Sequence, residues 1–224
     1  MDLRVPVIGI LRGVDPAFFP ELMAAAFGAG LQALEVTMNT AGAERMVADC
    51  RPLVPAGHLL GMGTVRSRPE AERAVAAGAM FLVTPNLDPE VIALARTRQI
   101  PVVAGALTPT EVFAAWQAGA DLVKVFPCRA MGGPRYIRDL LGPFDHAPLV
   151  AVGGVDADNA RDYLAAGARA VGVGPALFGA RALAERDASA VATNVRAFLS
   201  GASKLSGFVA HDLSGIIPYQ GGAE

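Results

Sequence analysis

The sequence predicts an α/β protein in which strands and helices alternate around a parallel (β/α)8 barrel. Three observations predict this class: four copies of a helix-to-strand unit, four further apolar strands between them, and a length of 224 residues. Strands that alternate with helices pair in parallel, because each helix carries the chain back to the edge where the strands begin. Eight such units close a barrel, and this chain length lies at the small end of that class.

The first observation is a helix that ends in Ala-Gly or Gly-Ala directly before an apolar strand. This unit occurs four times, as FGAGLQALEV (27–36), AAGAMFLVT (76–84), QAGADLVKV (117–125) and AAGARAVGV (165–173). Its glycines recur at intervals of 41 to 48 residues and are Gly30, Gly78, Gly119 and Gly167. Glycine adopts the left-handed conformation in which many helices end, so each copy predicts a helix terminus followed by a strand.

The second observation is a set of four apolar runs that lie between these units. In chain order they are VPVIGI (5–10), HLLGMG (58–63), PVVAGA (101–106) and PLVAVGG (148–154). Each of the eight strands is followed by a helix-like segment. An open, doubly wound sheet is the alternative, and the lack of a GxGxxG motif after the first strand weakens it. We therefore predict a single-domain TIM barrel over residues 1–199, followed by a C-terminal tail over 200–224.

Composition excludes several classes of function. A hydrophobic content of 53% predicts a globular core, and a net charge of -2 without clustered Lys and Arg argues against a nucleic-acid partner. No apolar stretch reaches the roughly 20 residues that span a bilayer, and the first strand is too short for a signal peptide. These features predict a soluble, cytoplasmic protein with no membrane partner.

Metal-binding motifs are also missing from the sequence. Its two cysteines, Cys50 and Cys128, form no CxxC pair, and its three histidines are far apart. This leaves no recognisable zinc motif, although a site built from distant residues stays open. We expect no metal.

Polar residues and glycines gather where the predicted strands end. In a (β/α)8 barrel the C-terminal ends of the strands form the functional face. The candidates at this face are Arg12, Glu35, Thr64, Pro85, Lys124, Phe126, Val152, Gly153, Gly154 and Gly174.

Lys124 interrupts an otherwise apolar strand in the stretch DLVKVFPC (121–128). A buried ammonium must find a partner, reach water or lose its proton. The period of two in a strand places Leu122, Lys124 and Phe126 on one face. If that face lines the barrel, Lys124 is an amine with a lowered pKa that can attack a carbonyl; otherwise it is a lysine that reaches water at the rim.

Glu35 is a second charge among apolar neighbours, in ALEVTMN (33–39). Alone it predicts only a carboxylate that is satisfied by local hydrogen bonds. Beside a lysine inside the barrel it predicts a proton shuttle, because imine chemistry needs an acid/base group and burial tunes a glutamate for that task.

Two glycine loops predict an anion site. They lie in VAVGGVDADNA (150–160) and VGVGPALF (171–178), after the seventh and eighth strands, where barrels of this class commonly bind phosphate. Tight-turn glycine is the alternative for either loop taken alone. Thr64 offers donors to a carboxylate. Arg12 is either a solvated loop residue or a partner for a substrate carboxylate or phosphate, and we assign it, with Gly153, Gly154 and Gly174, to the distal phosphate or other anion.

The motifs ILRG, LEVTMNT, GMGTV, VTPN, LTPTE, VKVFPC and VGGV resemble, in order and spacing, those of the KDPG/KDPGal aldolase family. The resemblance runs from Val5 to about Leu199. It implies a (β/α)8 barrel that commonly forms homotrimers and a class I, pyruvate-dependent aldolase without a metal or other cofactor. In this chain it implies Lys124 as the Schiff-base lysine and Glu35 as the general acid/base.

Two positions resemble the galactonate branch of that family rather than the gluconate branch. Asn39 stands where the gluconate type has an arginine, and Val152 stands where it has a threonine tied to stereochemical preference. Two positions depart from the family. Pro175 replaces a serine that touches phosphate, and Ala104 replaces a proline. Because proline has neither hydroxyl nor N–H, the first departure removes donors from the predicted anion site.

These residues predict cleavage of 2-dehydro-3-deoxy-6-phosphogalactonate to pyruvate and D-glyceraldehyde 3-phosphate. The gluconate epimer and 4-hydroxy-2-oxoglutarate stay open as substrates. Two other classes stay open as well: a sugar-phosphate epimerase that forms no imine, and a barrel that binds a sugar acid without turnover.

Overall fold

A computed structural model describes residues 1 and 3–202, and within them eight parallel strands close into a barrel. The strands are β1 (Val7–Leu11), β2 (Ala33–Thr37), β3 (Leu59–Gly63), β4 (Leu82–Val83), β5 (Val102–Ala106), β6 (Leu122–Val125), β7 (Leu149–Val152) and β8 (Ala170–Val173). Each strand pairs with the next in the chain, and β8 pairs with β1. The predicted TIM barrel is confirmed.

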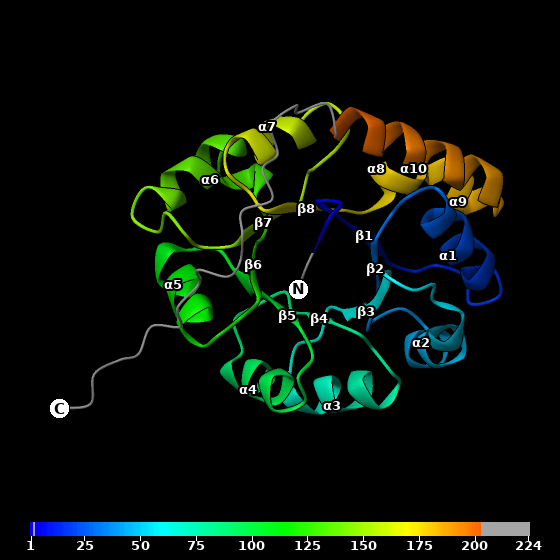
Figure 1. The fold of residues 1–224 in the computed structure, drawn as a ribbon, viewed down its shortest axis with the longest axis horizontal. Helices are drawn as coiled ribbons and strands as arrows, with labels where there is room; N and C mark the ends of the chain where they lie inside the picture. The colour runs from blue at the N-terminus through cyan, green and yellow to red at the C-terminus, as the bar shows by residue number, and fades with distance from the viewer. Residues whose placement is uncertain (2, 203–224) are drawn as a thin grey trace.

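Helices surround the ring of strands, as Figure 1 shows in a view down the barrel. They are α1 (Phe19–Gly28), α2 (Ala43–Cys50), α3 (Arg68–Ala76), α4 (Pro89–Thr97), α5 (Pro109–Gln117), α6 (Pro134–Leu141), α7 (Ala160–Ala165), α8 (Pro175–Phe178), α9 (Ala180–Glu185) and α10 (Ala188–Ala202), with the 3-10 turns η1 (Arg51–Leu53) and η2 (Arg129–Met131). The last helix, α10, packs against α1, so the first and last helices of the chain lie side by side.

The four glycines that were predicted to end helices have the predicted left-handed conformation. Gly30, Gly78, Gly119 and Gly167 all have left-handed φ angles, between 89° and 103°. Strand β4 is shorter than expected, with two residues. Its ladder nevertheless extends on both sides, because the N–H of Met80 donates to the carbonyl of Leu60 and the N–H of Thr84 donates to that of Val103.

Alternate residues of the strands face two different environments. On β6, Val123 and Val125 belong to the large cluster between strands and helices, whereas Leu122 belongs to a smaller cluster inside the barrel. Because neighbouring strand residues point to opposite faces, Lys124 shares the inner face with Leu122. On β2, Ala33 belongs to the inner cluster, which gives Glu35 the same orientation.

The end of the barrel where the strands begin is filled with apolar side chains. Met1 and Leu3 pack against the inner cluster, and Figure 1 shows the N-terminus in the middle of the ring. The polar inner residues lie toward the opposite end, where the strands finish.

The chain beyond the barrel is described only in part. Residues 200–202, predicted as the start of a tail, form the last turn of α10, and the remainder of the predicted tail lies outside the described residues. Among the helices that are described, none is long and apolar enough to cross a membrane.

Candidate active site

Lys124 lies on β6 and is almost fully buried, with 6% of its surface exposed. Its neighbours in the sheet are Gly105 on β5 and Val150 on β7. Burial lowers the pKa of its ammonium, the charge of Arg12 lowers that pKa further, and the carboxylate of Glu35 opposes both effects. The amine is therefore closer to its neutral, nucleophilic form than an ordinary surface lysine.

Glu35 lies on β2, with 1% of its surface exposed. Burial raises its pKa to about 7, while the positive charges of Lys124 and Arg12 act in the opposite direction. Within the described residues its Oε2 atom has no hydrogen-bond partner. A buried carboxyl oxygen without a partner is costly, and a pKa near neutrality suits a group that must both take up and release a proton.

Two glycines make room for this site, and the sequence did not reveal their roles. A Cβ on Gly63 would lie 2.3 Å from Oε1 of Glu35, so any other residue on β3 would collide with that carboxylate. A Cβ on Gly105 would lie 2.4 Å from the carbonyl carbon of Pro85, which brings the backbone after β4 directly over β5. The signal for both was a glycine near the end of an apolar strand.

Arg12, Asn39 and Thr64 come together from the ends of three neighbouring strands. The Nη1 atom of Arg12 donates to Oδ1 of Asn39 at 2.8 Å, and its Nη2 atom donates to Oγ1 of Thr64 at 3.3 Å. Thr64 has a φ of +55°, which is unusual for a β-branched residue and stores strain of about 1–3 kcal/mol. Such strain is typical of residues that a site holds in position.

A pair of buried threonines fixes the loop that carries Arg12. The Oγ1 atoms of Thr37 and Thr40 are 2.9 Å apart, and the backbone N–H of Gly13 donates to Oγ1 of Thr40 at 2.9 Å. These bonds tie the loop after β1 to the end of β2. Thr40 lies in the motif LEVTMNT, but nothing in the sequence marks it as a tie between the two loops.

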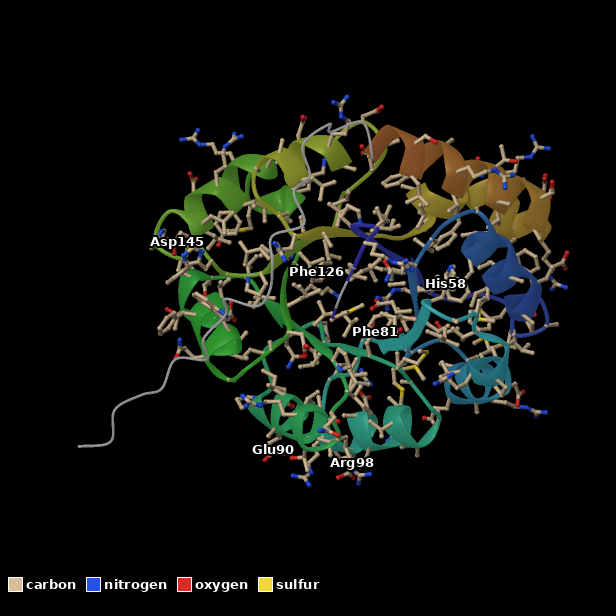
Figure 2. The ribbon with its side chains drawn as sticks, in the orientation of Figure 1. His58, Phe81, Glu90, Arg98, Phe126 and Asp145 are labelled. Atoms are coloured by element: carbon tan, nitrogen blue, oxygen red, sulfur yellow. The ribbon has the colours of Figure 1, made fainter. Side chains whose placement is uncertain are left out.

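Phe126 lies above the lysine. Its ring centroid is 5.1 Å from Nζ of Lys124, and 40% of its surface is exposed. In Figure 2 the side chain of Phe126 appears within the ring of strands, whereas Glu90, Arg98 and Asp145 lie on the outer side of the helices. Phe126 is thus an apolar surface at the open end of the barrel, as its alternation with Lys124 predicts.

The loop after β7 has the conformation that only glycine adopts readily. Gly153 and Gly154 have φ angles of 95° and 80°. Val152, which precedes them, is buried with 6% exposed and belongs to the inner cluster. Gly174 precedes the four-residue helix α8, whose first residue is Pro175. The loops after β7 and β8 are adjacent because these strands pair.

Cys128 is fully buried, and burial raises the pKa of its thiol to about 11, while a hydrogen bond with Tyr163 acts in the opposite direction. A thiol that stays protonated is a poor nucleophile, which agrees with the passive role predicted for it. Among the described residues no group of three His, Cys, Asp or Glu side chains is placed to hold a metal ion.

The fold and the comparisons define the chain as an aldolase, a lyase that acts on carbon–carbon bonds. A model of the KDPG and KHG aldolase family matches residues 4–194, and the chain belongs to this family.

Three similar proteins illustrate the match. The chain is 38% identical over 175 residues to a probable 2-dehydro-3-deoxy-6-phosphogalactonate aldolase of Rhizobium meliloti (strain 1021), covering 77% of this chain and 82% of that protein. A solved structure described as native KDPGal has a TM-score of 0.83 and 31% identity, covering 90% of this chain and 96% of its own. A KDPG aldolase from Legionella pneumophila, solved with pyruvate as a covalent carbinolamine, has a TM-score of 0.80 and 26% identity, covering 87% and 94%.

Proposed function

We propose that this aldolase cleaves 2-dehydro-3-deoxy-6-phosphogalactonate to pyruvate and D-glyceraldehyde 3-phosphate through an imine on Lys124. The observation that carries the proposal is the buried pair of Lys124 and Glu35, with pKa values shifted toward neutral forms at the open end of the barrel. Pairs of titratable groups with shifted pKa values are typical of acid/base sites. The names of the similar proteins support the same chemistry.

The proposed reaction begins when the neutral amine of Lys124 attacks the C2 carbonyl of the substrate. Glu35, as a carboxylic acid, protonates the departing hydroxyl, so the carbinolamine loses water and becomes an iminium ion, which accepts the electron pair when the C3–C4 bond breaks. Glu35 takes the proton of the C4 hydroxyl, so the aldehyde leaves and an enamine remains. The same carboxyl then returns the proton to C3, and water hydrolyses the imine to release pyruvate. The iminium is the electron sink, so the mechanism requires neither a metal nor another cofactor.

In this proposal Thr64 and Arg12 bind the carboxylate end of the substrate. The sequence predicted Arg12 at the distal phosphate; its hydrogen bond to Thr64 favours the carboxylate end instead. A guanidinium matches a carboxylate with paired donors. Phe126 packs on the pyruvyl group, and Pro85 lines the wall between β4 and β5.

The distal end of the substrate falls to Val152, Gly153, Gly154 and Gly174. Val152 offers a methyl surface near C4, where an unpaired substrate hydroxyl is disfavoured, and this supports discrimination between the two C4 epimers. Pro175 favours one alternative: at this position the chain offers no N–H or hydroxyl to phosphate, which keeps 4-hydroxy-2-oxoglutarate as a second candidate substrate.

We also propose that the protein forms a homotrimer in the cytoplasm. Apolar side chains that a single copy leaves exposed, such as Phe113 on α5 and Met131 on η2, support an interface between copies. Light scattering should then give three times the 23.1 kDa mass of the chain. Cell fractionation tests the location.

Borohydride trapping with pyruvate, followed by peptide mass mapping, tests the proposed function. We expect a reduced pyruvyl adduct on Lys124 that is absent in Lys124→Ala. A folded protein without an adduct on any lysine would contradict the imine and favour an epimerase or a binding protein.

A further inference from the structure

The distal part of the proposed site lacks an assigned positive charge. A phosphate monoester carries close to two negative charges at neutral pH. The charged residue proposed for substrate binding, Arg12, is bonded to Asn39 and Thr64 toward the carboxylate end. Helix α8 has only four residues and starts with Pro175, which has no N–H to offer. A cation from elsewhere in the chain is therefore needed if phosphate is recognised here.

Arg129 lies directly against the glycine loop after β7. It is the first residue of η2, and its backbone N–H donates to the carbonyl of Gly153 at 3.1 Å. Its aliphatic chain crosses Gly154, because a Cβ on Gly154 would lie 2.4 Å from Cδ and 2.5 Å from Cβ of Arg129. Glycine at 154 thus serves a second purpose besides its left-handed φ: it lets the arginine lie across the loop.

The guanidinium of Arg129 is available to a ligand. Its side chain is 68% exposed, and within residues 1 and 3–202 its acidic partner is Asp156, with Nη1 and Oδ2 3.5 Å apart. Such an exposed pair contributes little to stability, so a ligand can displace it at small cost. Asp156 itself is fixed by the backbone N–H groups of Asp158 and Asn159, at 3.1 Å and 3.2 Å. The carboxylate therefore keeps the guanidinium near the loop while the site is empty.

The same loop offers backbone donors beside this cation. In the part of the chain that the structure describes, no acceptor takes the N–H of Gly154 or of Val155. A guanidinium next to free backbone N–H groups is a combination that binds phosphate oxygens well.

We propose that Arg129 binds the distal phosphate of the substrate and is the residue that makes the enzyme prefer phosphorylated 2-keto acids. This inference rests on the proposed function and adds to it the cation that Pro175 and Arg12 do not supply. Arginine is suited to the task because its planar fork presents several donors to a phosphate.

The test compares Arg129→Gln, Arg129→Lys and wild type with a phosphorylated substrate and its unphosphorylated counterpart. We expect Arg129→Gln to lose roughly 10- to 100-fold in kcat/KM for the phosphorylated substrate, mainly through KM, with little change for the unphosphorylated one. Arg129→Lys should recover part of the loss. The matched control is Arg135→Gln, which removes another exposed arginine with a carboxylate partner, Asp139 at 4.0 Å, and should leave both substrates unaffected.

A second measurement is independent of turnover. Calorimetric titration with inorganic phosphate should show binding to wild type and to Arg135→Gln, and at least roughly tenfold weaker binding to Arg129→Gln. Equal phosphate binding in all three proteins, or an equal loss of kcat/KM for both substrates, would overturn the role of Arg129. Borohydride trapping on Lys124 in the same preparations separates the two proposals, since an adduct without an Arg129 effect rejects only this inference. Selective loss of phosphate binding without an adduct rejects only the aldolase mechanism.

Discussion

The barrel interior has two levels, which lie two residues apart along the same strands. The lower level is apolar, and the upper level holds titratable side chains. On β6 the lower level has Leu122 and the upper level Lys124; on β2 the corresponding residues are Ala33 and Glu35. The lower residues belong to an apolar cluster, whereas the upper residues are buried titratable groups with shifted pKa values.

The lower level fits together closely. Phe81 is fully buried there, and its ring lies so close to β3 that a Cβ on Gly61 would meet it at 2.5 Å. At the upper level Gly63, on the same strand, makes room for a carboxylate, one oxygen of which has no partner in the part of the chain that the structure describes. A glycine therefore serves packing in one place and a reactive group in the other. The lower level therefore stabilises the fold. The upper level lowers the stability of the fold but provides the reactive groups.

Replacing Lys124 with Met should give the largest effect on activity and little effect on stability. We expect kcat/KM to fall at least about 1,000-fold, because the nucleophile is lost while the side-chain volume is nearly kept. At pH 6 the free energy of unfolding should stay the same or rise, since Glu35, with a pKa of about 7, takes up a proton and leaves no buried charge. Steady-state kinetics and urea denaturation check both parts. A marked loss of stability would mean that Lys124 serves the fold.

Replacing Phe81 with Ala should do the reverse. We expect the free energy of unfolding to fall by about 3–5 kcal/mol, because a fully buried ring is removed from a closely packed cluster. Molecules that remain folded should still form the pyruvate adduct on Lys124. The control is Leu53→Ala, which removes a side chain on η1 that is 62% exposed and should change stability by less than about 1 kcal/mol. Similar losses of unfolding free energy in both variants would contradict the proposal that the lower level is the part that stabilises the fold.

How much of this could be predicted from the sequence differs between the two levels. Apolar alternation, glycine terminators and strand spacing predicted the barrel, and the charges of Lys124 and Glu35 stood out because apolar strands surround them. The contacts of Arg12 with Asn39 and Thr64 could not be predicted, because they join three strands through side-chain conformations. The space that Gly63 provides was hidden for the same reason: a glycine in a strand does not indicate which side chain needs the room.

Replacing Glu35 with Gln should remove a pH dependence of stability that comes from the upper level alone. Because its pKa is raised from 4.5 to about 7 in the folded protein, the folded state binds more protons than the unfolded state in this range. Wild-type stability should therefore fall as pH rises from 4.5 to 7, by about 3 kcal/mol in all. Glu35→Gln has no such group, so its free energy of unfolding relative to that of wild type should rise as the pH rises through the same range.

The same change should lower kcat/KM by roughly 100- to 10,000-fold, and the limb near pH 7 that Glu35 gives the wild-type profile should disappear. Thermal unfolding across pH, with Glu111→Gln as a control on a half-buried capping carboxylate, checks the stability part. A stability difference independent of pH would mean that Glu35 is not the group whose titration opposes folding.

The smallest effect on activity should come from the hydrogen bonds of Thr40, which fix the loop beside the upper level. Thr40→Val keeps the shape of the side chain but removes the oxygen that accepts the N–H of Gly13 and contacts Thr37. Because Gly13 follows Arg12 directly, we expect the arginine to lose part of its fixed position and KM to rise about 3- to 10-fold, the effect of one lost hydrogen bond. Since Thr40 touches neither reacting group, kcat should change little. Thr40→Ser retains the oxygen and should restore KM, whereas a serine variant as impaired as the valine variant would assign Thr40 to packing alone.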